Sequence, residues 1–294
     1  MFRDRVSDDI YLFSSNRYAQ VTAGVVASAE GAAVIDTLAF PEETLEIKNF
    51  VENKIGQRVL YVINTHYHAD HTMGNYLFGG VEIVANELCR ELMDTRGRRG
   101  LELARAQTPE LARASLVLPT MTFAQGSLNL YLGKKTLHLF PSPGHSFDHI
   151  SVLVKEDRIL FAGDSMMPVP HIVDGNIDEM EATLREIPRM GLENVVQGHG
   201  EIVLRGEIDD TVKSHLRYLA CIRRKVKVAV RKRDRAGLLK VDITDCGKSR
   251  IPLNGMVAEL HTRNLLALYD RSANEDRPEP QPERRSRQKK MLDK

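Results

Sequence analysis

The sequence predicts an α/β fold in which sheets and helices alternate along the chain. Short apolar runs rich in valine and isoleucine recur through it, as expected of buried strands, and helical patterns separate them. Several of these runs end directly at a carboxylate or a glycine turn. Because open α/β sheets usually place their sites at the carboxyl ends of strands, the same pattern predicts a polar site at one edge of the sheets.

The first half of the chain is predicted to alternate strands with helices. Pro41 is expected to begin a helix that reaches about Lys54, because proline is favoured in a first helical turn and acidic residues follow it. Strands are expected at residues 18–28, 32–36, 59–64 and 81–85. From Asn86 to about Leu118 the pattern becomes helical and rich in arginine, so this stretch is predicted to leave the sheet as an excursion.

The second half is predicted to form another sheet and then to become helical. Antiparallel strands are expected at residues 127–132, 135–140, 149–155 and 158–162. Amphipathic helices are expected at residues 178–190, 208–233 and 254–270, where apolar positions recur at a near-helical period. Residues 271–294 are charged, proline-rich and almost without apolar side chains, so we predict a disordered tail there.

The densest chemical signal is the run Thr65-His66-Tyr67-His68-Ala69-Asp70-His71, which follows a strand-like apolar segment. Three imidazoles and a carboxylate within six residues favour zinc, iron or manganese over calcium or magnesium. His66 and His68 can converge on one cation. Asp70 and His71 are adjacent, so they more easily point to a second position beside the first.

Three further candidate ligands lie downstream in similar settings. His145 lies in a Pro-Gly-His-Ser turn, Asp164 ends an apolar run, and His199 lies in a Gly-His-Gly turn after another apolar run. Such repetition is hard to obtain by chance, which favours one shared site over buried structural histidines. His149, by contrast, is interpreted as a strand histidine on a polar face, with a supporting position behind the metal ligands as the alternative.

These residues resemble the metallo-β-lactamase superfamily, whose HxHxDH signature is present in full at positions 66–71. The downstream ligands match in the expected order, and the resemblance covers roughly residues 11–200. It implies two divalent transition metals, with zinc expected and iron or manganese as alternatives. One metal would be held by His66, His68 and His145 and the other by Asp70, His71 and His199, with Asp164 bridging them.

The resemblance also implies the architecture, a four-layer αβ/βα metallo-β-lactamase sandwich with a C-terminal helical extension. The sandwich domain is expected to cover residues 1–205, and helices within 206–270 are expected to pack on it. The excursion at about 86–118 is expected to form a helical flap over the site. A surface excursion without substrate contact remains the alternative, because loops of this size vary freely.

The implied function is a binuclear metal-dependent hydrolase in which a metal-bridging hydroxide cleaves an ester, thioester or lactone. Asp70 would orient the nucleophile and carry a proton to the leaving group. The true β-lactamases of the superfamily lack the bridging carboxylate, so Asp164 argues for β-lactamase activity only as a side reaction. His68 stands where the dioxygen-reducing branch of the superfamily carries glutamate, which argues against dioxygen reduction. The 34 residues between Asp164 and His199 leave no room for an inserted nuclease domain.

Two other functions remain open at this stage. A mononuclear iron persulfide dioxygenase has the same fold and an overlapping ligand set, and the number of bound metals would separate it from a hydrolase. A nucleic-acid-processing enzyme rests only on the basic run from Arg223 to Arg233. A solvated helix face is the preferred interpretation of that run, because valines interleave at helical spacing and no aromatic stacking platform accompanies it.

Substrate contacts are expected from the flap and from the residues that follow the ligands. For apolar walls we expect Met121, Phe123 and Met166, with core packing as the alternative for Met166. In the loop after the bridging carboxylate we expect His171, with a surface role as the alternative. For an anionic group on the substrate, we expect Arg98 and Arg99.

Composition limits the partners and the cellular location that we expect. The net charge of +1 gives no sign of a polyanionic partner, and no stretch approaches the roughly 18 apolar residues of a membrane span. The N-terminus lacks the apolar segment of a signal peptide. Cys89, Cys221 and Cys246 are scattered, odd in number and without metal-site spacing. We therefore expect a cytoplasmic enzyme acting on a small molecule, without membrane or nucleic-acid partners; homo-oligomerisation is left open.

Overall fold

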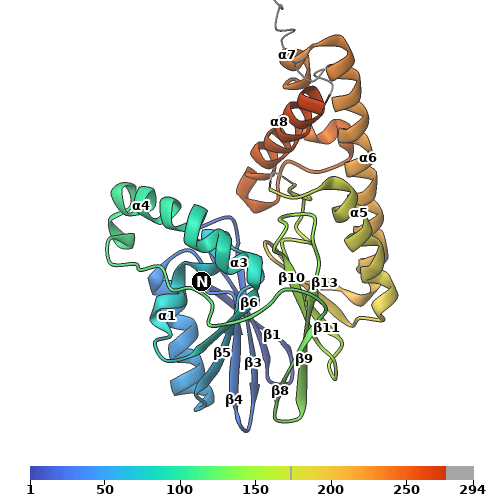
Figure 1. Cartoon of the computed structure of the whole chain (residues 1–294). Helices are drawn as coiled ribbons and strands as arrows, with labels where there is room; N and C mark the ends of the chain where they lie inside the picture. Colours follow the sequence, from blue (N-terminus) through green and yellow to red (C-terminus); the bar gives the residue numbers. More distant parts are fainter. Residues whose placement is uncertain (173, 276–294) are drawn as a thin grey trace, which may run out of the picture.

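Two β-sheets pack face to face in the computed structural model, which describes residues 1–172 and 174–275 (Figure 1). The first sheet has the order β1-β2-β3-β4-β5-β6-β7 and the second has the order β13-β12-β11-β10-β9-β8. The strands of the first sheet are β1 (Phe2–Ser7), β2 (Ile10–Ser14), β3 (Thr22–Ser28), β4 (Gly31–Ile35), β5 (Val59–Ile63), β6 (Glu82–Asn86) and β7 (Met121–Phe123). Those of the second are β8 (Leu128–Leu132), β9 (Lys135–Pro141), β10 (Ile150–Val154), β11 (Ile159–Gly163), β12 (Asn194–Gln197) and β13 (Val203–Leu204).

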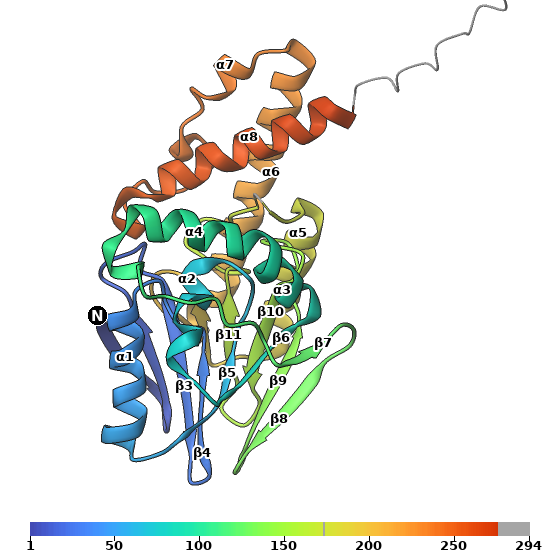
Figure 2. The same cartoon turned by 60° about the vertical axis from the view of Figure 1, so that its left-hand side comes forward.

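Helices cover the outer faces of both sheets and complete the four layers. On the first sheet lies α1 (Pro41–Asn49), continued by the π-helical turn Phe50–Ile55. On the second lie α5 (Ile177–Glu186), continued by Ile187–Met190, and α6 (Ile208–Lys232), as Figures 1 and 2 show. Apolar side chains from both sheets, such as Ile63 and Val152, meet between them in one buried cluster. The α/β sandwich expected from the sequence is therefore confirmed.

Several predicted boundaries need correction. The predicted strand at 18–28 begins only at Thr22, because Ala19 and Gln20 have positive φ angles that a strand does not allow. The N-terminal hairpin of β1 and β2 was not predicted, since β1 is mostly exposed and carries alternating charges that resemble a surface segment. The antiparallel run β8-β9-β10-β11 agrees with the expectation.

The excursion at 86–118 is helical and packs on the outside of the histidine-rich turn. It comprises α3 (Glu87–Leu92), the turn Met93–Gly97, α4 (Arg98–Gln107) and the turn Pro109–Leu111. Cys89 and Met93 pack on Tyr67, and Leu101 and Leu111 lie in a second cluster with Met73. The excursion therefore supports the turn that carries the candidate ligands.

The C-terminal region forms a helical extension above the edge of the sandwich (Figure 2). After α6 come α7 (Arg235–Leu238), the turns Ile243–Cys246 and Leu253–Gly255, and α8 (Val257–Glu275), which crosses α6. The predicted tail began at Arg271, but residues 271–275 continue α8; the remainder of that prediction, 276–294, lies outside the described residues. Among the helices the structure describes, none has the length and apolar character needed to cross a membrane.

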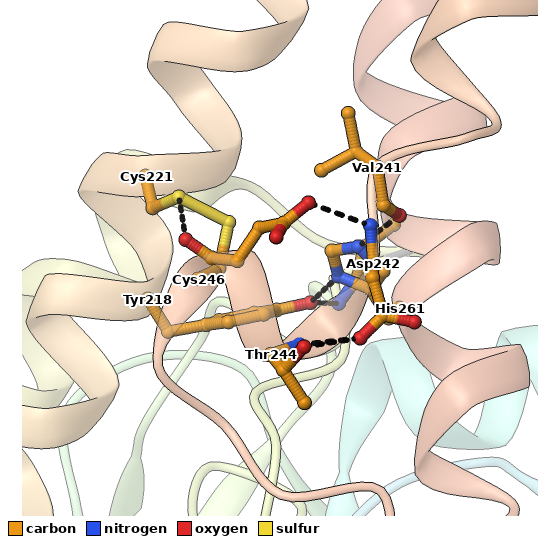
Figure 3. Close-up of a disulfide and its surroundings, with 9 residues drawn as sticks. Tyr218, Cys221, Val241, Asp242, Thr244, Cys246 and His261 are labelled. Atoms are coloured by element: carbon orange, nitrogen blue, oxygen red, sulfur yellow. Dashed lines mark hydrogen bonds between the residues drawn. A yellow bond between two sulfur atoms is a disulfide. The ribbon is translucent and has the colours of Figure 1, made fainter.

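A disulfide bond joins Cys221 of α6 to Cys246, across 25 residues of sequence (Figure 3). The sequence analysis found the cysteines scattered and odd in number and predicted no pair among them, because the pairing depends on a fold that brings α6 beside the Ile243–Cys246 turn. Beside the disulfide, the hydroxyl of Tyr218 lies 2.9 Å from Nδ1 of His261, whose Nε2 lies 3.1 Å from the Val241 carbonyl. Disulfide and hydrogen bonds together tie α6 and α8 to the segment between them.

Candidate metal centre

The histidine-rich turn lies at the carboxyl end of β5, where buried side chains fix its path. Thr65 donates from its backbone amide and its hydroxyl to the two carboxylate oxygens of Asp36, both at 2.8 Å. Asn64 and Asn75 hydrogen-bond each other across the turn. A short helix, α2 (Ala69–Thr72), then begins after His68. These contacts hold the HxHxDH run at the edge of the first sheet, facing the second.

His66, His68 and His145 bring three ring nitrogens together. Nδ1 of His68 lies 3.0 Å from Nε2 of His66 and 2.9 Å from Nε2 of His145. The opposite ring nitrogens donate elsewhere: His68 to Asp174 at 3.0 Å and His145 to the His171 carbonyl at 2.7 Å. When the outer nitrogen of such a ring donates its N–H, the clustered nitrogen is left as an acceptor, and acceptors that face one another are favourable around a cation.

The same logic applies to His66, because the hydroxyl of Thr65 is committed to Asp36 and must accept from Nδ1 of His66 at 3.0 Å. Burial holds the pKa values of His66 and His145 well below the ordinary range, so both rings are neutral. This set of bare nitrogens fits a transition metal, and zinc most simply.

Asp70, His71 and His199 form a second group beside the first. Nε2 of His199 lies 3.4 Å from a carboxylate oxygen of Asp70, and Nε2 of His71 lies 3.8 Å from the same oxygen. Nδ1 of His71 donates to Asp36 at 2.8 Å, and Nδ1 of His199 donates to the carbonyl of Ala19 at 2.9 Å. Both Nε2 atoms are therefore directed at Asp70 and at the space beside it.

Asp164 follows β11 and lies between the two groups. Its Oδ1 is 3.3 Å from Nε2 of His71, and its Oδ2 is 3.3 Å from Nε2 of His145 and 3.5 Å from Nε2 of His199. Oδ1 of Asp164 and Nε2 of His71 are buried without a hydrogen-bond partner. Orphaned buried atoms of this kind are costly unless a cation satisfies them, so the residues fit two metals with a shared carboxylate.

The charges around the second ligand group, formed by Asp70, His71 and His199, favour a cation there. Burial opposes charge on His71 and His199, but the carboxylates outweigh it, Asp164 first. They raise the pKa of His71 well above its usual value and that of His199 to about 10. Burial likewise opposes charge on Asp70 and Asp164, yet the neighbouring histidines hold both carboxyl pKa values below their ordinary range. A divalent cation would meet the same demand.

Two carboxylates that orient ligands were not singled out from the sequence. Asp36 stands directly after β4, as Asp164 stands after β11, so the pattern of an apolar strand ending in aspartate could have revealed it. Asp174 accepts from His68 at 3.0 Å and from the hydroxyl of Tyr67 at 2.6 Å. It lies in a loop, where no strand or helix pattern marks it.

The ligand groups form the floor of a cleft of about 500 Å³. Its walls come largely from a loop before β3 and from the C-terminal helices. The lining residues beyond the candidate ligands are Tyr18, Ala19, Ala69, Met167, His171, Asp174, Leu253, Met256, Glu259, Leu260 and Arg263. One wall is therefore apolar, and the rim carries the Glu259–Arg263 ion pair at 2.5 Å.

Of the predicted substrate contacts, His171 lines this cleft and the others lie elsewhere. Met121 and Phe123 belong to β7 and pack on the cluster between the sheets. Met166 is fully buried in the core beneath the C-terminal helices. Arg98 pairs with Asp94 on the outside of the flap.

Arg99, an exposed residue of α4, also lies outside the lining. The flap instead approaches the site through Arg96, which lies 3.6 Å from Asp174 and 3.4 Å from the Tyr67 hydroxyl.

The preferred interpretation of His149, a strand histidine on a polar face, is wrong. His149 is buried, and its ring stacks behind His66 with centroids 5.1 Å apart. Its Nδ1 lies within hydrogen-bond distance of the hydroxyls of Ser142 and Ser165. His149 therefore supports a candidate ligand by packing.

Comparisons with known proteins identify the family of the chain. A family model described as the Metallo-beta-lactamase superfamily matches residues 17–213, which include all seven candidate ligands and end before α8. The chain is 29% identical over 191 residues to a Metallo-beta-lactamase type 2 of Bacillus cereus, covering 62% of this chain and 68% of that protein. It is 29% identical over 159 residues to an Acyl-coenzyme A thioesterase, MBLAC2, of Bos taurus, covering 48% of this chain and 56% of that one.

Solved structures show the same fold. A metallo-beta-lactamase from Pontibacter korlensis superposes with a TM-score of 0.59 at 21% identity, covering 72% of this chain and 97% of that chain. In five curated relatives, the matched region spans 40% to 68% of the relative's own length. Since the family model covers well over half of the sequence, in a range that contains the histidine-rich turn, the chain belongs to the metallo-β-lactamase superfamily.

Proposed function

We propose that the protein is a binuclear metal-dependent hydrolase that cleaves thioesters, within a wider class that includes esters and lactones. The observation that carries this proposal is the position of Asp164, whose two oxygens lie 3.3 Å from His71 and 3.3 Å from His145, one in each ligand group. Two bound divalent cations would supply a hydroxide nucleophile at neutral pH and would polarise the substrate carbonyl. Zinc suits the ligands, with iron or manganese as alternatives.

Asp70 and Tyr18 are the side chains best placed to move or hold protons. Asp70 lines the cleft beside His199, and its carboxylate can accept a proton from the nucleophile and pass it to the leaving group. Tyr18 lines the same cleft, and the charge of Asp70, followed by burial, raises its pKa. Its phenol therefore stays protonated at neutral pH and can donate a hydrogen bond to substrate oxygen.

The shape of the cleft supports an acyl substrate. Met167, Leu253 and Met256 give the cleft an apolar wall beside the ligands, which favours a medium aliphatic chain over a compact polar ring. A relative named as an acyl-coenzyme A thioesterase supports the thioester within the class. β-Lactam hydrolysis would then be a side activity.

Metal analysis and a substrate panel test the proposal. Protein purified without chelator is expected to contain close to two transition-metal ions per chain, and Asp164→Ala is expected to contain fewer. Turnover on the panel should be fastest with a thioester, slower with an ester or lactone and slowest with a cephalosporin. A single iron per chain, with oxygen consumed on a glutathione persulfide, would establish the dioxygenase alternative instead. The cytoplasmic location and the oligomeric state stay predictions.

A further inference from the structure

A second cleft, of about 530 Å³, lies between the start of α5, the C-terminal part of α6 and the end of α8. Its lining residues are Asn176, Ile177, Asp178, Arg223, Val226, Lys227, Val230, Arg231, Leu268, Arg271 and Ser272. We call it the basic groove. It contains part of the basic run on α6 that the sequence marked and that the proposed function does not use.

The groove combines a cationic rim with an apolar floor. Arg223, Lys227 and Arg231 recur every fourth residue, so they lie along one face of α6. Arg223 pairs with Asp178 at 2.7 Å, and Asp178 is the one carboxylate in the lining. Lys227 and Arg231 are exposed and form no salt bridge with a side chain that the structure describes.

The floor beneath these cations comes from all three helices. Ile177 of α5, Val226 and Val230 of α6 and Leu268 of α8 lie along it. A solvated helix face does not need a hollow of this kind. Cations above apolar side chains match a ligand that carries phosphate on an aliphatic or flat apolar group.

The basic groove is next to the metal cleft. Asp174 lines the metal cleft and Asn176 lines the groove, so the backbone between the two is at most about 7 Å long. On α8, Arg263 lines the first cleft and Leu268 the second. One extended molecule can therefore lie across the ridge.

The ridge between the clefts is fixed in place. Gly175 packs so closely on Gly144 that an added Cβ would collide with its carbonyl, and the Gly175 carbonyl accepts a hydrogen bond from Arg271. Asp174 is held by His68 on the other side. A ligand that spans the ridge would thus bind a preformed surface.

We propose that the basic groove binds the phosphate-bearing end of the substrate's leaving group, a free small-molecule thiol, while the thioester carbonyl lies over the metals. This inference rests on the proposed function, from which it takes the thioester. It adds the chemistry of the leaving group, which is an anionic phosphate ester on an extended thiol arm.

The test uses coenzyme A as the phosphorylated thiol and matched charge variants of α6. Lys227→Ala/Arg231→Ala removes two cations from the groove. Arg224→Ala/Lys232→Ala removes two exposed cations from the same helix outside the groove. Calorimetric titration is expected to show at least about tenfold weaker coenzyme A binding in the first variant and a change within about twofold in the second. An equal loss of coenzyme A affinity in both variants would show that only the overall positive charge of the helix matters, and it would overturn the proposal.

Kinetics give a second readout. For acetyl-coenzyme A, the groove variant should raise KM with kcat unchanged, whereas KM for an N-acetylcysteamine thioester, which lacks phosphate, should not change. An unchanged KM for both substrates would refute the inference while leaving the hydrolase proposal intact. If KM rises only for a thioester carried on an acyl carrier protein, the groove is a protein docking surface and the small-molecule assignment is wrong. If no thioester is cleaved, the thioester part of the proposed function fails and the leaving-group assignment fails with it, while the titration still decides whether the groove binds the phosphorylated thiol.

Discussion

Asn264 of α8 hydrogen-bonds the peptide groups on both sides of His171. Its side-chain amide donates to the Pro170 carbonyl at 2.7 Å, and its side-chain oxygen accepts from the Ile172 amide at 2.9 Å. The carbonyl of His171 in turn accepts from Nδ1 of His145 at 2.7 Å. A C-terminal helix therefore helps to orient a candidate metal ligand through a single loop.

Replacing Asn264 with alanine is expected to weaken both folding and metal binding. The side chain is fully buried, so its loss leaves the Pro170 carbonyl and the Ile172 amide unsatisfied, at about 1–3 kcal/mol for each group. Loosening the support of His145 should lower metal affinity by about tenfold. Thermal unfolding and a chelator competition titration measure the two effects. Thr262→Ala, on the opposite face of α8, is the control. Unchanged metal affinity in Asn264→Ala would limit Asn264 to a structural role.

Asp70→Asn is expected to reduce turnover far more than stability. The substitution keeps the shape of the side chain but removes the proton carrier and a ligand charge, and general acid–base catalysis alone contributes roughly 10²–10⁴-fold. Steady-state kinetics on the best panel substrate and a melting curve of the same sample give the comparison. Survival of activity within a few-fold would show that Asp70 does not have this role.

Met256 is expected to set the preference for acyl chain length. It lies in the cleft wall, so Met256→Ala should lower kcat/KM for a medium-chain thioester by about tenfold while changing the acetyl thioester little. Arg98→Ala serves as the control, because Arg98 lies on the flap outside the cleft lining. A larger fall in kcat/KM for Arg98→Ala than for Met256→Ala would show that the flap, and not the cleft wall, recognises the substrate.

Removal of the disulfide should lower stability without changing the metal centre. Cys221→Ala/Cys246→Ala opens a loop whose ends are 25 residues apart in sequence, and such cross-links typically contribute about 2–4 kcal/mol. Dithiothreitol should lower the melting temperature of the wild-type protein to about that of the variant, and it should leave the melting temperature of the variant unchanged. Metal content should stay the same in both. If reductant shifts the two proteins equally, the cross-link does not stabilise the fold.

The clustering of the candidate ligands was predictable, because the HxHxDH run follows β5 and the other three residues follow a strand or a glycine turn. Their binding of metal stays a prediction. The α/β sandwich was also predictable, because its strands carry apolar runs. Asp174 and the Asn264 contacts were not predictable, because they depend on loops and on helices more than 90 residues apart. Met121 and Phe123 were expected in the pocket on proximity in sequence, yet their side chains pack between the sheets.

The candidate ligands lie within residues 66–199, whereas much of the wall that would face a substrate lies within residues 253–263. The candidate ligands and much of the cleft wall are thus encoded in separate stretches of the gene. Laboratory evolution confined to the codons of the C-terminal segment could diversify the accepted acyl groups and leave the inorganic chemistry untouched. The library should stop before Asn264, the next residue of α8, because its hydrogen bonds connect this helix to the loop that supports His145.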